Sequence, residues 1–130
     1  MVSVIIPAFN CAKWLPASLN SLVNQSFRDW KALVVDDGSS DNTGQIADDF
    51  AARDNRIAVI HQTNAGSSVA RNVGLSWATG DYVYMFDGDD YLHPDLLKIA
   101  VSSLEKYPNA AFVTFDFQSV APSPGGGVYI

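Results

Sequence analysis

The 130-residue chain has little cysteine, few basic residues and no long apolar stretch. Its one cysteine, Cys11, excludes an internal disulfide and a cysteine-cage zinc site, and it suits a reducing compartment such as the cytoplasm. No apolar run approaches the roughly 20 residues that span a bilayer, so we expect no transmembrane segment. The first residues, 1–7, lack the basic start of a signal peptide and predict a strand instead.

Basic residues are outnumbered: 8 Lys and Arg stand against 14 Asp and Glu, a formal net charge of -6. Nucleic-acid binding needs a basic surface, so we expect no nucleic-acid partner. Hydrophobic residues make up 48% of the chain, which is enough for one globular core. We therefore expect one domain over residues 1–117, followed by an irregular tail rich in proline and glycine over residues 118–130.

Short apolar runs alternate with stretches of helical periodicity along residues 1–117. We expect strands at residues 2–6, 30–35, 57–60, 82–86 and 111–117. We expect helices at about 15–23, after residue 42, at 66–78 and at 94–105. This alternation predicts an α/β fold with a mostly parallel sheet and helices on both faces. Ligands of such sheets bind at the carboxyl ends of the strands.

Three carboxylates follow the predicted strand 82–86 directly, in the run Asp87-Gly88-Asp89-Asp90. Adjacent carboxylates repel one another, and a hard divalent cation such as Mg²⁺ or Mn²⁺ would relieve the repulsion. Gly88 lets the backbone bend and lets a ligand come close. The alternative is a solvated acidic turn, but the position after an apolar strand favours a ligand site.

Asp36 and Asp37 end the predicted strand 30–35. A carboxylate there can accept hydrogen bonds from a nucleoside base or a sugar hydroxyl. The alternative is a turn that caps the next helix, because residues 38–41 are rich in turn formers. We expect at least one of the two aspartates to bind a ligand.

Arg71 lies in the first turns of the predicted helix 66–78, where a helix amino end and a guanidinium would together attract phosphate. A surface ion pair explains it equally well. The histidines, His61 and His93, lack a metal-binding partner at suitable spacing, so structural roles are expected for both. Cys11 is interpreted as a loop residue.

Several motifs of other nucleotide-binding proteins are missing. No Gly-x-Gly-x-x-Gly follows the first predicted strand, and no Gly-x-x-x-x-Gly-Lys-Ser/Thr occurs. A phospho-acceptor receiver domain is a closer alternative, but it would need an acidic pair after the first strand. Residues 7–10, Pro-Ala-Phe-Asn, stand there instead.

Five blocks, in order, resemble the family-2 glycosyltransferases, which have the Rossmann-like GT-A nucleotide-sugar fold. They are VSVIIPAFN at 2–10, SLVNQSF at 21–27, VVDDGSSDNT at 34–43, NAG at 64–66 with ARNVG at 70–74, and GDY at 80–82 leading to FDGDD at 86–90. The resemblance covers residues 1 to about 107. It implies a GT-A domain that is truncated here, because the family's catalytic domain is considerably longer.

The resemblance also implies roles for individual residues. Residues 7–10 would line the nucleoside pocket, Asp37 would bind the base and Arg71 the nucleotide, while Asp87 and Asp89 would hold ribose and metal. The implied nucleotide-binding set is Pro7, Ala8, Phe9, Asn10, Asp37, Gly66, Arg71, Asp87, Gly88 and Asp89; the implied metal ligands are Asp87, Asp89 and Asp90.

The activity implied by the resemblance is transfer of a sugar, with inversion, from a nucleotide diphosphate to a glycan or lipid acceptor, as in polysaccharide biosynthesis. A UDP-sugar donor, Mn²⁺ or Mg²⁺ as cofactor and a cytoplasmic location are expected. The acceptor-binding half and its catalytic base would lie beyond residue 130, so the apolar surface left open would favour a homodimer. The alternative is a module that binds nucleotide and metal without turnover.

Overall fold

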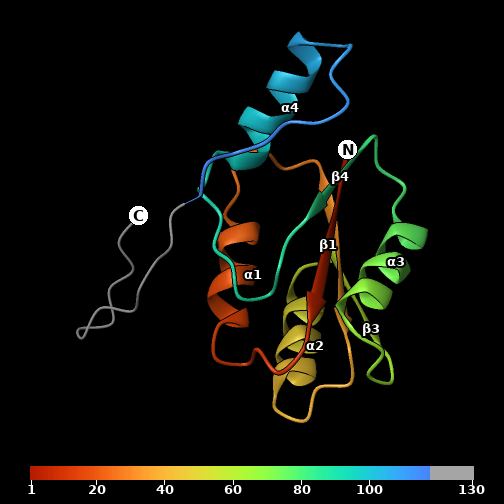
Figure 1. The fold of residues 1–130 in the computed structure, drawn as a ribbon. Coiled ribbons are helices and arrows are strands. Elements are labelled where there is room, and N and C mark those ends of the chain that lie inside the picture. Colours follow the sequence, from red (N-terminus) through yellow and green to blue (C-terminus); the bar gives the residue numbers. More distant parts are fainter. Residues whose placement is uncertain (118–130) are drawn as a thin grey trace.

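The computed structural model describes residues 1–117, in which strands and helices alternate (Figure 1). The strands are β1 (Val2–Ala8), β2 (Trp30–Asp36), β3 (Ile57–His61) and β4 (Tyr82–Met85). The helices are α1 (Leu15–Val23), α2 (Thr43–Arg53), α3 (Ser67–Trp77) and α4 (Leu96–Lys106). The predicted order of elements is confirmed as far as α4, whereas the predicted tail at 118–130 lies outside the described residues.

The strands form one parallel sheet in the order β3-β2-β1-β4. Val4 of β1 is in register with Ala32 of β2 on one side and with Tyr84 of β4 on the other. β1 is an interior strand, with β2 on one side of it and β4 on the other. Because all the strands are parallel, the carboxyl ends of β1, β2 and β4 lie at the same edge of the sheet. That edge is where a parallel α/β sheet binds its ligands.

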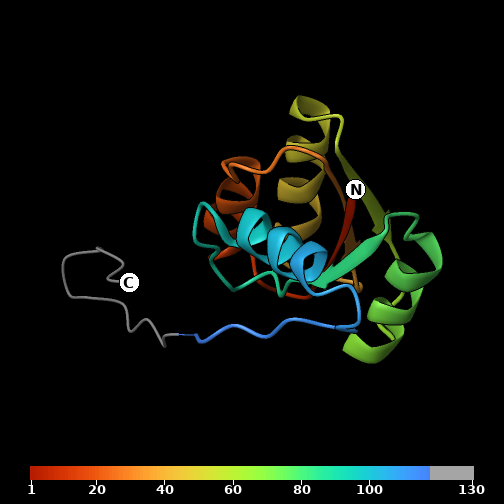
Figure 2. The same cartoon turned by 90° about the horizontal axis from the view of Figure 1, so that it is seen from above.

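Helices cover both faces of the sheet, as predicted. Figures 1 and 2 show α3 alone on one face and α1 and α2 on the other. β1 is buried on both faces, because Val4 and Ile6 point into the larger core while Ile5 faces α3. A strand buried in this way has a nearly continuous apolar sequence, which is why residues 2–6 contain little polar character.

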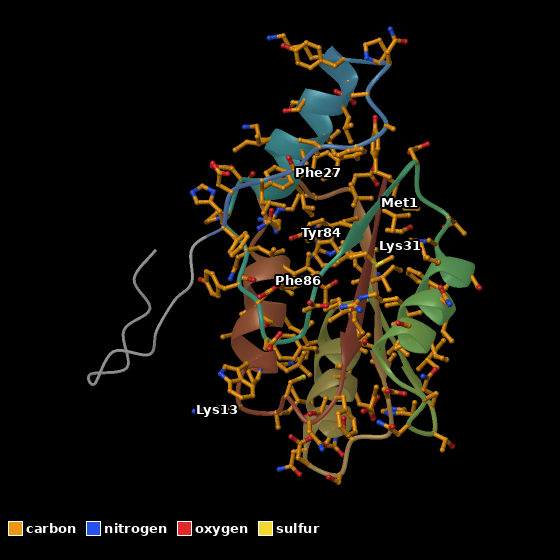
Figure 3. All side chains as sticks on the ribbon, in the orientation of Figure 1. Met1, Lys13, Phe27, Lys31, Tyr84 and Phe86 are labelled. Carbon is orange, nitrogen blue, oxygen red and sulfur yellow. The ribbon has the colours of Figure 1, made fainter. Side chains whose placement is uncertain are left out.

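Aromatic side chains fill the larger core beside β4. The rings of Tyr84 and Phe86 are stacked with centroids 6.1 Å apart, and Phe27 packs against the same core (Figure 3). Leu97 and Val101 of α4 are buried there as well. The core therefore extends past the end of β4 and holds the start of the 87–90 turn in place.

The predicted strand at 111–117 is wrong. Residues 111–117 form no strand, and Phe112 and Phe117 are 76% and 90% exposed. An alternating apolar sequence becomes a strand only where it can pair with a neighbouring strand and pack on a core. In the described residues β4 is the edge strand of the sheet, and residues 111–117 do not pair with it. Val83 and Met85 on β4 are 46% and 37% exposed, which leaves apolar surface at this edge. The expected homodimer stays a prediction.

Gly74 sets the distance between α3 and the sheet. A Cβ at this position would clash with Cγ2 of Ile5 on β1, and Gly74 is buried. A glycine here lets the helix lie close to the strand, so the start of α3 reaches the carboxyl edge of the sheet.

We predict that Gly74→Ala lowers the free energy of unfolding by about 1–3 kcal/mol, the usual cost of overpacking a filled interior. The gain in helix propensity, about 1 kcal/mol, offsets part of this cost. Urea unfolding measures the change. The control is Ser76→Ala, an exposed position on the same helix. Equal stability of Gly74→Ala and the wild-type chain would show that the helix does not need this close approach.

Candidate nucleotide-sugar site

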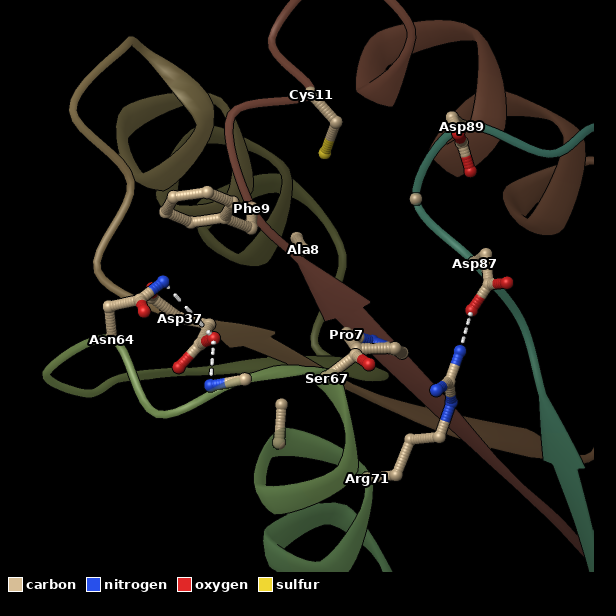
Figure 4. A pocket seen from close by; sticks show the side chains of 13 residues that line it. Pro7, Ala8, Phe9, Cys11, Asp37, Asn64, Ser67, Arg71, Asp87 and Asp89 are labelled. Atoms are coloured by element: carbon tan, nitrogen blue, oxygen red, sulfur yellow. Dashed lines mark hydrogen bonds and ion pairs between the residues drawn. The ribbon is translucent and has the colours of Figure 1, made fainter.

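A pocket of about 420 Å³ opens at the carboxyl edge of the sheet, between β1, β2, the start of α3 and the turn after β4 (Figure 4). Its volume is within the range of small-molecule sites. The lining residues are Pro7, Ala8, Phe9, Cys11, Asp37, Asn64, Gly66, Ser67, Ala70, Arg71, Asp87, Gly88 and Asp89.

Asp37 is the most heavily hydrogen-bonded side chain of the pocket. Its Oδ1 accepts the Nε2 hydrogen of Gln62 and the backbone N–H of Ala65, each at 2.8 Å. Its Oδ2 accepts the N–H of Gly66 at 2.8 Å and, at 3.4 Å, Nδ2 of Asn64. The carboxylate therefore organises the whole connection from β3 to α3.

These hydrogen bonds also set the charge of the site. The hydrogen bond from Gln62, with those from the amides of Ala65 and Gly66, outweighs burial and holds the pKa of the Asp37 carboxyl below its ordinary value. Asp37 is only 3% exposed yet remains ionised at neutral pH. An ionised carboxylate accepts hydrogen bonds and donates none, which suits recognition of an N–H group.

The start of α3 forms the floor of the pocket. Gly66 precedes the helix with φ of 96°, a conformation that a glycine adopts without strain. No side chain caps this helix, and its first turn holds no acidic residue. The free N–H groups of the first turn, beginning at Ser67, give the pocket a positive end that favours an anion.

Arg71 lies one turn further along α3 and reaches across the pocket. Its Nη2 donates to Oδ1 of Asp87 at 2.8 Å (Figure 4). The side chains are 36% and 48% exposed, so this ion pair contributes little stability on its own. The surface ion pair considered from the sequence is thus present, and it places Arg71 beside the acidic turn.

The acidic turn at 87–90 is held against α1. The N–H of Asp90 donates to the carbonyl of Asp87 at 3.0 Å, and Ser18 donates its hydroxyl to the carbonyl of Gly88 at 2.9 Å. A Cβ on Gly88 would lie 3.0 Å from Sγ of Cys11, so glycine lets the turn approach the loop after β1. Gly88 also lines the pocket.

Negative charge accumulates in this turn. Burial, together with the charges of Asp87 and Asp89, raises the pKa of the Asp90 carboxyl. Within residues 1–117, no three His, Cys, Asp or Glu side chains are grouped to hold a metal ion. Asp87, Asp89 and Asp90 are therefore not assembled as a three-ligand site. Two protein carboxylates completed by phosphate and water still suit Mg²⁺ or Mn²⁺.

Nine of the ten residues expected to bind nucleotide line this pocket, and Asn10 does not. Asn10 adopts a left-handed conformation, φ 47°, and its Oδ1 accepts the N–H of Ser40 at 2.8 Å. It therefore holds the loop after β2 in place. The sequence reasoning missed four lining residues: Cys11, which was interpreted only as a loop residue, and Asn64, Ser67 and Ala70. For Asn64, Ser67 and Ala70 the available signal was their nearness in sequence to Gly66 and Arg71, and for Cys11 its position directly after residues 7–10.

Asp36, His61 and Asp48 form a second set of polar contacts, next to the Asp37 network. Asp36, 6% exposed, accepts the N–H of Ser39 at 3.1 Å, and its Oδ2 lies 2.9 Å from Nδ1 of His61. Nε2 of His61 lies 3.0 Å from Oδ1 of Asp48 on α2. Asp36 thus has a structural role, and Asp37 is the member of the pair that faces the pocket.

Comparison with known proteins identifies the family. The model of "Glycosyl transferase family 2" matches residues 3–124. The chain belongs to this family. It is 45% identical over 92 residues to the uncharacterized glycosyltransferase EpsJ of Bacillus subtilis, covering 71% of this chain and 27% of EpsJ.

Solved structures share the fold. TarS of S. aureus, residues 1-349 in complex with UDP, superimposes with a TM-score of 0.77 at 35% identity, covering 82% of this chain and 32% of that one. The mannosyltransferase PcManGT of Pyrobaculum calidifontis, in complex with GDP-Man and Mn2+, gives a TM-score of 0.74 at 28% identity. It covers 79% of this chain and 32% of that one. The predicted GT-A fold is confirmed.

The family-2 chain spans about a third or less of the length of these relatives. In the part that the structure describes, no helix is both long and apolar enough to cross a membrane.

We predict that Asp37→Ala lowers the free energy of unfolding by about 1–3 kcal/mol, because the donors of the 62–66 connection lose a charged acceptor. The difference should be present above pH 3.8, the ordinary pKa of the carboxyl, and should vanish as pH falls through the lowered value. Urea unfolding at pH 7 and at acid pH measures it. The control is Asp49→Ala on exposed α2 surface. Unchanged stability at pH 7 would mean that Asp37 does not organise the connection.

Proposed function

We propose that the pocket binds a nucleotide-diphosphate sugar, with UDP-sugar as the favoured donor, together with Mn²⁺ or Mg²⁺. The observation that carries this proposal is the pocket itself. An ionised acceptor, Asp37, an uncapped helix start with Arg71, and the carboxylates of Asp87 and Asp89 line one cavity. The TarS structures with UDP and with UDP-GlcNAc support a uridine donor.

Asp37 would recognise the base. Each carboxylate oxygen can accept about two hydrogen bonds, and Oδ1 already accepts those of Gln62 and Ala65. Oδ2 accepts the N–H of Gly66 and has only the long 3.4 Å contact with Asn64. A base N–H would take the place of that long contact. The loop of Pro7, Ala8 and Phe9 would form the opposite wall.

The diphosphate would lie between the start of α3 and the acidic turn. The free N–H groups of α3 and the guanidinium of Arg71 supply positive charge on one side. Asp87 and Asp89 would hold the metal and the ribose on the other, with Asp90 adjoining. Arg71 would exchange Asp87 for the nucleotide when ligand binds. The metal, when bound, would stabilise negative charge on the leaving diphosphate.

The transfer itself would proceed with inversion. The acceptor hydroxyl of a glycan or lipid would lose its proton to a carboxylate base and attack the anomeric carbon, while the bond to the diphosphate breaks. We place that base outside this chain, because Asp37 is committed to the 62–66 connection and the carboxylates of the acidic turn to the leaving group. We further propose a cytoplasmic enzyme of polysaccharide biosynthesis, with which an unpaired Cys11 is consistent.

A second candidate is a module that binds nucleotide and metal without turnover. The carboxylates that line the pocket are Asp37, Asp87 and Asp89, and the roles proposed for them leave none to act as a base, which favours this candidate for this polypeptide alone. The two candidates share the pocket and differ in transfer activity.

We predict that UDP binds at least about tenfold more weakly once divalent metal is chelated, a difference of about 1.4 kcal/mol. Calorimetric titration with Mn²⁺ and with a chelator measures it. In Asp89→Asn the dependence on metal should be reduced, whereas Asp49→Asn on exposed α2 surface should keep it. Equal affinity with and without chelator would contradict the metal assignment.

We predict that this chain alone does not transfer sugar. Loss of a positioned base typically costs about 10²–10⁴-fold, and loss of acceptor positioning adds to it. Labelled nucleotide sugars, incubated with the chain and a set of acceptors, provide the assay, with a longer family-2 protein that contains this domain as the reference. Glycosylated product formed at a rate close to the reference would place the base within this chain.

A further inference from the structure

His61, at the end of β3, stands between two carboxylates. Nδ1 lies 2.9 Å from Oδ2 of Asp36, and Nε2 lies 3.0 Å from Oδ1 of Asp48. A neutral imidazole carries one N–H and one lone pair, so it can satisfy only one of these contacts. Both contacts are favourable only for the imidazolium form. The geometry therefore corresponds to a protonated histidine.

The bridge lies directly behind the Asp37 network. Asp36 is the last residue of β2 and directly precedes Asp37, and its backbone carbonyl accepts the N–H of Gln62 at 2.9 Å. Gln62 follows His61 and donates its side chain to Asp37. His61 therefore sits where the ends of β2 and β3 meet, one residue before the connection that shapes the pocket. Asp48 fixes the same ring to α2.

We propose that His61 is a positioning residue of the nucleotide pocket. In its protonated form it bridges Asp36 and Asp48, fixes Asp37 and the 62–66 connection, and makes nucleotide binding tighter at mildly acidic than at alkaline pH. This inference rests on the proposed function for its nucleotide part. Its positioning part concerns the free protein and is testable without ligand.

The direction of the pH dependence follows from the surrounding charges. Asp36 on β2 and then Asp48 on α2 raise the pKa of His61, against the opposing effect of burial. A raised pKa in the folded state means that the bridge stabilises fully below the ordinary value of 6.5. Its contribution is lost as pH rises through the raised value. The interaction of His61 with Asp36 is the stronger of the two, because the Asp36 side chain is 8% exposed and that of Asp48 is 51% exposed.

The test compares amide hydrogen exchange of Ala65 and Gly66, the backbone donors to Asp37, between pH 5.5 and 9 by NMR. In the wild-type chain, protection corrected for intrinsic exchange should fall about twofold to fivefold with rising pH, the size expected for partly exposed ion pairs. In His61→Gln it should be low throughout. His61→Arg keeps a charged donor at every pH, so its protection should stay high. His93→Gln replaces the other histidine and should behave as wild type.

UDP affinity measured on the same four proteins completes the experiment. As pH rises, the affinity of the wild type for UDP should fall more than that of His61→Gln. Ionisation of UDP itself affects both proteins equally, so the difference between them reports on His61. If protection of the Ala65 and Gly66 amides depends on pH in His61→Gln as it does in the wild type, His61 does not have the proposed role. If UDP binds none of the proteins at any pH, the proposed function fails, and the exchange data still decide the positioning role.

Discussion

The pocket depends on the Asp37 carboxylate, which accepts hydrogen bonds from both backbone and side-chain donors. Asp37 also donates its own N–H to the carbonyl of Ala8 at 2.9 Å, which ties the end of β2 to the end of β1. Its side chain holds the amides of Ala65 and Gly66. Three chain segments that are far apart in sequence, the ends of β1 and β2 and the residues before α3, therefore meet at this one residue.

Charge is arranged around this centre in two opposed groups. The uncapped start of α3 and Arg71 are positive, whereas Asp87, Asp89 and Asp90 form a negative turn on the other side of the pocket. In the free protein the two groups neutralise each other in part through the Arg71–Asp87 ion pair. A ligand with both a diphosphate and a cation would satisfy both groups at once, since phosphate would replace Asp87 at Arg71 and the cation would replace Arg71 at Asp87.

The sequence predicted most of this arrangement, because its signals are local. The apolar run 2–6 and the aspartates after residues 35 and 86 place carboxylates at strand ends without any knowledge of packing. The segment 111–117 was misassigned because its apolar alternation says nothing about whether a partner strand is present. The hydrogen bond that Asn10 accepts from Ser40 was not predictable for a similar reason, since it depends on how two loops approach each other. The bridge of His61 needs residues from β2, β3 and α2, and no spacing in the sequence reveals it.

We propose that the pocket around Asp37 and Arg71 binds a nucleotide diphosphate. Chemical-shift perturbation of the backbone amides by UDP and Mg²⁺ tests it most directly, because it maps the contact residue by residue. We expect the largest shifts at Ala65, Gly66, Ser67 and Arg71 and at the 87–89 turn, with α4 unaffected. Shifts confined to α4, or saturation with no change at the start of α3, would contradict it.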